Sequence, residues 1–192
     1  FYQKVRDVFA STSADYAPSS DLARTFFATI QNKLLFAVTG HTAGELVLER
    51  ADAASPTMGL TTWKGPRLRK SDVTIAKNYL SELEVSELNR LTTMFLDFAE
   101  DRASRRQTTL MADWVGQTDR FLTFNERRVL PHAGRVSNAA MEARVGEIYS
   151  DFDGRRRTLE ASAAEAEEMA DLAELTDIEV IHPGITIGGE GA

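Results

Sequence analysis

Apolar residues recur every three or four positions through most of the chain, which is the spacing of one helix face. Gly40 follows the first such stretch and is suited to end a helix in the left-handed conformation. The pattern predicts a central helix over residues 21–38. Its face consists of Leu22, Phe26, Ile30, Leu34 and Val38, widened by Phe27 and Leu35.

Two four-residue patterns predict where later helices begin. Thr42 to Glu45 and Ser81 to Glu84 fit the capping box, in which a hydroxyl accepts a backbone amide and a Glu three residues on returns to the cap. The first box predicts a helix to about Ala53, and the second predicts one to about Arg106. We expect the second helix to lie antiparallel to a further helix over residues 109–129.

Residues 54–70 contain two Pro, two Gly and no regular period, which predicts an irregular loop. Loops of this length commonly have a function. We expect Trp63 to anchor this loop and a short helix to follow over residues 71–80. The apolar face of the last helix, which Ser137 is placed to cap, thins to Ala beyond Arg157, so that portion is expected to be extended, exposed or paired with a partner.

These elements predict an all-α fold of about six helices with a long acidic C-terminal helix. The predicted organisation is a helical core domain over residues 1–157, an acidic helical extension over 158–181 and a disordered tail over 182–192. The composition agrees, because 192 residues that are 43% hydrophobic can bury a substantial core.

The net charge of −7 is distributed unevenly. All 22 Lys and Arg lie in residues 1–157 together with 20 of the 29 acids, which gives this part a charge of +2; the last 35 residues carry the other nine acids and a charge of −9. A nearly neutral body with local basic clusters can approach phosphate, which a uniformly acidic body would repel.

Several classes of site and compartment are disfavoured. The chain has no Cys, which excludes disulfides and zinc–thiolate sites. Only three His are present, so a metal site built on several His is not expected, while a carboxylate site for Mg²⁺ stays open. We expect no cofactor. The sequence contains no run of about 18 apolar residues, so we expect no membrane span. The cytoplasm is the default compartment.

His41 is the best single catalytic candidate. It precedes a predicted helix and lies four positions from Glu45, so it can be read as a general base oriented by that carboxylate, with Lys77 as a phosphate ligand. The other reading is structural. Capping alone explains Thr42 and Glu45 at this spacing, and His41 then only helps the turn.

A basic set lies within the predicted loop. Such a set can bind phosphates while an aromatic ring stacks on a base. The alternative is a solvated, positively charged loop with a buried Trp63. The candidates for phosphate or nucleic-acid binding are Trp63, Lys64, Arg67, Arg69 and Lys70.

Amides and a charge within predicted helices form a third group of candidates. Such side chains need partners if they are buried. They form either one hydrogen-bond network that fixes the fold or the floor of a pocket. The residues are Gln31, Asn32, Lys33 and Asn78.

The order and spacing of several segments resemble the RhuM family, which is associated with bacterial virulence. The likeness extends from Phe1 to about Arg157. It rests on Phe1-Tyr2-Gln3-Lys4-Val5-Arg6-Asp7, Gly40-His41-Thr42-Ala43-Gly44-Glu45, Met58-Gly59-Leu60-Thr61-Thr62-Trp63-Lys64-Gly65, Ala76-Lys77-Asn78-Tyr79-Leu80 and Met111-Ala112-Asp113-Trp114. The chain departs from the family at Thr57, where Asn is frequent, and at Gly44, where Ala is usual.

The resemblance implies a longer, DNA-associated protein whose N-terminal part looks DNA-binding, with this chain as a C-terminal domain. It brings no established catalytic residues. Three hypotheses follow: a domain that binds nucleic acid or a protein partner through the basic loop, an enzyme acting on a phosphate-containing substrate at His41, Glu45 and Lys77, and a structural domain that forms homo-oligomers through its acidic helix.

Overall fold

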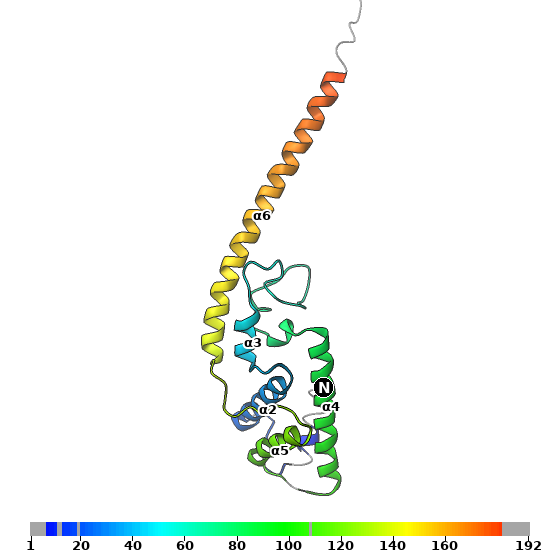
Figure 1. Ribbon diagram of the computed structural model, residues 1–192, viewed down its shortest axis with the longest axis vertical. Coiled ribbons are helices and arrows are strands. Elements are labelled where there is room, and N and C mark those ends of the chain that lie inside the picture. Colours follow the sequence, from blue (N-terminus) through cyan, green and yellow to red (C-terminus); the bar gives the residue numbers. More distant parts are fainter. Residues whose placement is uncertain (1–6, 11–12, 19, 108, 182–192) are drawn as a thin grey trace, which may run out of the picture. The chain divides into compact units, whose positions relative to one another are not determined.

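The computed structural model describes residues 7–10, 13–18, 20–107 and 109–181, with side chains as far as Glu174. Every regular element within these residues is helical, which confirms the predicted all-α fold (Figure 1). The predicted disorder over residues 182–192 falls outside the described residues. The elements are α2 (Asp21–Thr39), α3 (Ala43–Arg50), the 3₁₀ helix η1 (Ala76–Tyr79), α4 (Glu82–Ser104), α5 (Met111–Phe124) and α6 (Asn138–Ile181).

The chain divides into two compact units, residues 1–149 and 150–192. Within the first unit α2 is central, as predicted, because it contacts α3, α4 and α5. It buries Ala23, Phe26, Ile30 and Leu34, whereas Leu22 is half exposed, so the buried face begins at Ala23 and not at Leu22. Gly40 ends the helix with a φ of +77°, as expected for a left-handed cap.

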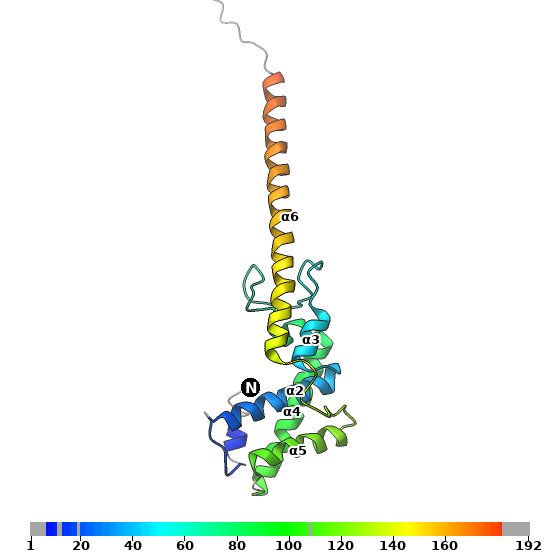
Figure 2. The ribbon, with the colours of Figure 1, turned by 90° about the vertical axis from the view of Figure 1, so that its left-hand side faces the viewer.

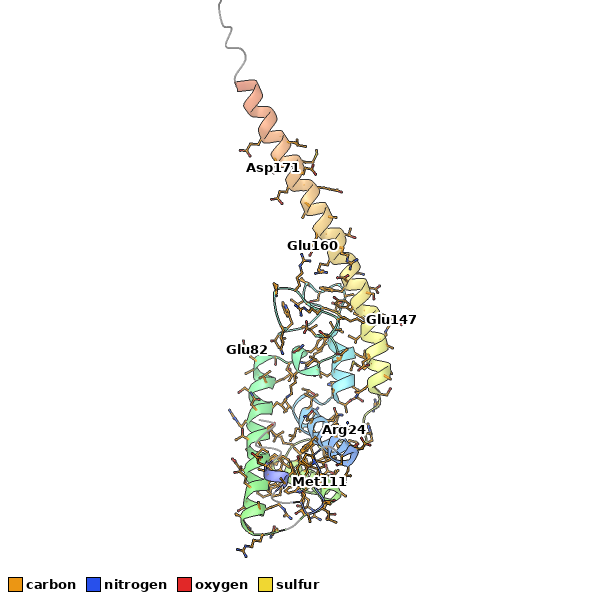
Figure 3. All side chains as sticks on the ribbon, turned by 180° about the vertical axis from the view of Figure 1, so that it is seen from behind. Arg24, Glu82, Met111, Glu147, Glu160 and Asp171 are labelled. Atoms are coloured by element: carbon orange, nitrogen blue, oxygen red, sulfur yellow. The ribbon has the colours of Figure 1, made fainter. Side chains whose placement is uncertain are left out.

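An aromatic cluster forms the core where α2, α4 and α5 meet. Trp114 of α5 is fully buried and donates its indole N–H to the Ser13 hydroxyl at 3.0 Å. Its ring packs edge-on against Phe9, with centroids 5.0 Å apart, and contacts Phe95 of α4. Met111 lies among these densely packed side chains (Figure 3). This part of the unit is a conventional hydrophobic core.

The predicted antiparallel pairing of α4 and α5 is wrong. The two helices cross steeply, and both pack on α2 instead (Figures 1 and 2). Large rings occupy the crossing: Phe95 and Phe98 of α4 both contact Phe121 of α5. Edge-to-face and tilted ring contacts of this kind replace the regular side-chain interdigitation of an antiparallel pair.

Helix starts were predicted better than helix ends. Both capping boxes are present, at Thr42 and at Ser81. However, α3 ends at Arg50 rather than near Ala53, and residues 71–80 form turns and η1 instead of the predicted helix. Polar side chains explain both differences, because the Asp52 carboxylate accepts the Ala54 amide and the Asn78 side chain donates to the Asp72 carbonyl.

The last helix, α6, is continuous for 44 residues. Ser137 caps it, as predicted, by accepting the Ala140 amide at 3.2 Å. Val145 is fully buried, but Leu159 and Met169 are each 69% exposed. Of the three states expected beyond Arg157, the structure therefore shows an exposed helix, along which acidic side chains such as Asp171 project (Figure 3).

Candidate functional site

The loop between α3 and η1 is held by buried apolar side chains. Met58 and Val73 are fully inaccessible to solvent, and Leu60 and Leu68 are almost so. The predicted anchor, Trp63, is half-buried, so these fully buried residues hold the loop together with it. In both ribbon views the loop extends past the C-terminal end of α3, away from the aromatic core (Figures 1 and 2). It is therefore an ordered surface feature of the first unit.

A turn at Met58 and Gly59 fixes how the loop leaves α3. Both residues adopt left-handed backbone conformations, with φ of +54° and +79°. A Cβ atom on Gly59 would lie 2.0 Å from the backbone oxygen of Arg50, far inside contact distance. Only glycine fits against the end of α3 at this point.

Hydrogen bonds tie the two sides of the loop to η1. The amides of Thr61 and Thr62 donate to the Asn78 carbonyl at 2.7 and 3.3 Å. The Thr61 hydroxyl lies within hydrogen-bond distance of the carbonyls of Asn78 and Leu80. On the other side, the Arg69 amide donates to the buried carboxylate of Asp72 at 2.9 Å. Hydrogen bonds therefore hold both ends of the segment from Thr62 to Arg69.

The cations of this segment lie at the surface. Lys64, Arg69 and Lys70 are exposed, and their side chains form no ion pair or hydrogen bond with any described residue. Arg67 and Lys77 are exposed as well. Residues 54–81 hold these five cations and one carboxylate, Asp72, for a net charge of +4. Because Asp72 is buried, this surface carries positive charge without an exposed acid of its own.

Trp63 differs from the other tryptophan of the chain. Trp114 is buried among rings and uses its indole N–H. The Trp63 ring is half-buried, and it makes no ring contact and no hydrogen bond with the described residues. It stands beside Lys64, at the point where the loop leaves Thr62.

An ion pair joins the end of α3 to α4. Arg50 pairs with Glu84 of α4, and its two terminal guanidinium nitrogens donate to the carboxylate at 2.7 and 2.6 Å. Arg50 also donates to the Tyr79 carbonyl of η1 at 2.7 Å. The Arg50 hydrogen bonds lower the pKa of Glu84 to about 2, and the same pairing raises the pKa of Arg50. Burial raises the pKa of Tyr79.

Among the described residues, no hydrogen bond or ion pair joins His41 to Glu45. The Glu45 carboxylate accepts the amides of Thr42 and Arg135, each at 2.9 Å, and the Thr42 hydrogen bond is the main reason that its pKa is lowered. The His41 ring instead lies 3.1 Å from the carboxylate of Glu49, a residue that the sequence reasoning missed. Glu49 lies eight positions after His41 and four after Glu45, which is a helical spacing that offered a signal.

The two ring nitrogens of His41 face acceptors. Nδ1 lies 3.0 Å from the Thr39 carbonyl, and Nε2 faces Glu49. Both ring nitrogens therefore lie against groups of the protein itself, beside the start of α3.

Lys77 lies in η1, and Arg50 joins η1 to the C-terminal end of α3. His41 precedes the N-terminal end of α3. The two ends of this eight-residue helix are about 12 Å apart. The convergence of His41, Glu45, Lys77 and Asn78 on one cleft stays a prediction, as does the enzymatic alternative built on it.

The predicted polar group makes separate contacts. The Asn32 side chain accepts the Ala43 amide at 3.0 Å and so caps α3 from α2. Lys33 is buried and donates to Asp119 of α5 at 2.6 Å. The Asn78 side chain donates to the loop residue Asp72, and Gln31 is exposed. These hydrogen bonds join different pairs of elements, which suits a role in fixing the fold.

Within the described part of the chain, no three His, Asp or Glu side chains are grouped so that they could hold a metal ion. No helix among the described residues is both long enough and apolar enough to cross a bilayer.

Comparison with known proteins gives one match. The model of a family described as the virulence protein RhuM family matches residues 1–160, which is most of the chain. No curated protein and no solved structure matches. The match agrees with the resemblance found in the sequence and covers the loop, η1 and all of the candidate residues.

Proposed function

This chain belongs to the RhuM family of virulence proteins, and we propose that it binds the phosphate backbone of nucleic acid through its basic loop, residues 63–70. In this proposal the chain is the effector or assembly part of a longer, DNA-associated protein. An N-terminal part, expected from the resemblance, supplies further DNA contacts.

One observation carries the proposal: Lys64, Arg69 and Lys70 are exposed and unpaired among the described residues, on a loop whose ends are fixed. Cations elsewhere are often neutralised, as Arg127 is by Glu87 and Arg144 by Glu147. Unpaired cations attract phosphate without first losing an intramolecular partner. A fixed loop also loses little conformational entropy on binding.

Buried residues explain why the charges are held in place. Met58, Leu60 and Leu68 pin the loop from below, and the hydrogen bonds to Asn78 and Asp72 close its two sides. Phosphate binding by such a surface is driven by the release of counterions, so it weakens as salt is added. Salt dependence is therefore the property to measure.

The first prediction concerns these three cations. In the full chain, the triple variant Lys64→Ala, Arg69→Ala, Lys70→Ala should bind a fluorescein-labelled DNA oligonucleotide more weakly. Its plot of log affinity against log salt should be shallower by about 2 to 3, because each lost phosphate contact removes about 0.7 to 0.9 from the slope. Fluorescence anisotropy over a range of salt concentrations gives both quantities.

The matched control removes equal charge elsewhere. Arg90, Arg120 and Arg155 are also exposed and without an ion pair among the described residues, but they lie on α4, α5 and α6. The triple Ala variant at these positions should keep the slope of the unmodified chain. Equal slopes for all three proteins would contradict the proposal and leave the basic loop as a solvated surface, or as a surface for a protein partner.

A further inference from the structure

The two tryptophans of this chain occupy opposite environments. Trp114 is fully buried, and its indole N–H and ring are both engaged. Trp63 lies half-buried at the surface, and its ring and N–H make no contact of these kinds with the described residues. Part of the Trp63 side chain thus packs against the loop, and the rest stays open to a ligand.

The backbone before Trp63 is held closely. The amides of Thr61 and Thr62 both donate to the carbonyl of Asn78, a residue whose side chain donates to the Asp72 carbonyl. After Trp63 the chain turns through Gly65, whose φ of +82° is left-handed. The backbone that carries the indole is therefore held at the start of a turn.

The turn that carries Trp63 also carries cations. Lys64 is the next residue, and the guanidinium of Arg69 lies 4.0 Å from the position that a Cβ on Gly65 would occupy. Both are exposed and unpaired among the described residues. An aromatic ring and cations on one turn match the chemistry of a nucleotide, which presents a flat base beside a phosphate.

We propose that Trp63 stacks on an unpaired base, so that the ligand of the basic loop is single-stranded nucleic acid. This inference rests on the proposed phosphate binding and specifies its substrate class. In a duplex the bases stack on one another and only their edges reach the grooves, so a ring at the loop surface cannot reach a base face. In a single strand the base faces are accessible.

The proposal also predicts low sequence preference. Trp63 is the single aromatic residue in the sequence between residues 54 and 78. The next aromatic residue, Tyr79, is buried and cannot offer a second ring. One ring stacks one base, and every base has a π-face. Phosphates on either side of that base meet Lys64 and Arg69. The site therefore reads whether a strand is unpaired, and does not read its sequence.

The test replaces the ring and preserves the charges. In the full chain, Trp63→Leu should weaken the binding of oligo-dT of about a dozen nucleotides by about 5- to 150-fold, the range for loss of one stacked base. It should leave binding to a DNA duplex of equal length unchanged within about twofold, because the phosphate contacts remain. Trp63→Phe keeps an aromatic face and should restore most of the oligo-dT affinity. Oligo-U of equal length separates RNA from DNA as the source of the strand.

The outcomes separate the two proposals. If Trp63→Leu weakens oligo-dT and duplex equally, or if Trp63→Phe fails to restore binding, the ring only supports the loop and the stacking inference is wrong. In that case a shallower salt slope in the triple cation variant still supports phosphate binding. If the slope of the triple variant does not change, phosphate binding itself fails, whatever Trp63 does. Thermal melting of each variant checks that the loop stays folded.

Discussion

At the scale of single residues, Glu84 has two roles. Its carboxylate accepts the Ser81 amide at 2.9 Å and so caps α4, while both of its oxygens accept the guanidinium of Arg50 at the end of α3. Arg50 in turn donates to the Tyr79 carbonyl at 2.7 Å. One carboxylate thus connects α3, η1 and the start of α4. These are the elements that flank the basic loop in the chain.

The second prediction concerns Glu84→Gln. The amide can still accept from Ser81, but it no longer balances Arg50, which is mostly removed from solvent. We expect a loss of about 2 to 3 kcal/mol in the free energy of unfolding, measured with urea, since the shift in pKa from 4.5 to about 2 corresponds to that order. The control is Glu82→Gln on the exposed side of the same turn, with an effect below about 0.5 kcal/mol.

The pH dependence follows from the direction of the same shift. Because the folded pKa of Glu84 is lower than its unfolded pKa, its contribution is complete above pH 4.5 and is lost as the pH falls towards 2. The difference in unfolding free energy between the unmodified chain and Glu84→Gln should therefore shrink over that interval. A difference that stays constant down to pH 2 would show that the ion pair does not set the pKa.

At the scale of elements, the loop from Ala51 to Ile75 shows how a segment without a regular period can be fixed. Its order comes from four buried apolar side chains, a left-handed turn and backbone hydrogen bonds to η1. Removing any one of these should release the cations that they hold in place. The left-handed turn is the constraint that a single substitution tests most directly.

The third prediction compares Gly59→Ala with Gly65→Ala. Both glycines have nearly the same φ, +79° and +82°, so the backbone strain of about 1 to 2 kcal/mol is common to both substitutions. Only at Gly59 does the new Cβ strike the Arg50 carbonyl, at 2.0 Å, whereas at Gly65 the nearest atom is 4.0 Å away. Gly59→Ala should therefore lower the melting temperature clearly more. Equal effects would mean that the turn can shift away from α3.

The sequence predicted the parts of the fold that depend on local pattern. The capping boxes at Thr42 and Ser81 and the glycine cap at Gly40 are all present, because each is decided within a few residues. The helix predicted over residues 71–80 is wrong because Asp72 and Asn78 bind the backbone of turns instead. These contacts are local too, since their partners lie three and six residues apart, so this is a local signal that the prediction missed.

The candidate site shows the same division. The basic set was visible as composition, and the structure adds that Lys64, Arg69 and Lys70 are exposed on a fixed loop. The pairing of Arg50 with Glu84 joins residues 34 positions apart, and the Lys33 contact with Asp119 joins residues 86 apart. Contacts at such separations depend on how the helices cross, and the crossing of α4 and α5 was itself predicted wrongly.

At the scale of the whole molecule, the charge of the chain lies mostly in the exposed part of α6. From Thr158 to its end α6 carries eight acids and no cation, and Leu159, Met169 and Leu172 are all more than half exposed. Like charges on neighbouring turns destabilise an isolated helix. A partner would cover the apolar residues and offset part of this cost, and a second copy of the chain remains our hypothesis for that partner.

The fourth prediction removes this part of the chain. Deleting residues 160–192 should lower the mass measured in solution from that of a dimer to that of a monomer, since the deletion removes Met169 and Leu172. Light scattering coupled to size-exclusion chromatography over a range of protein concentrations measures it. An unchanged mass together with an unchanged melting temperature would make the segment a solubilising appendage and end the oligomer hypothesis.

The contrast between the two tryptophans has an optical consequence. Trp114 is sealed among rings and should emit at short wavelength and resist collisional quenchers, whereas the Trp63 ring is partly open to water and should emit at longer wavelength and be quenched readily. The chain thus carries two intrinsic fluorophores, one in its core and one in its surface loop. A change confined to the red part of the emission spectrum would report on the loop alone, with no label attached.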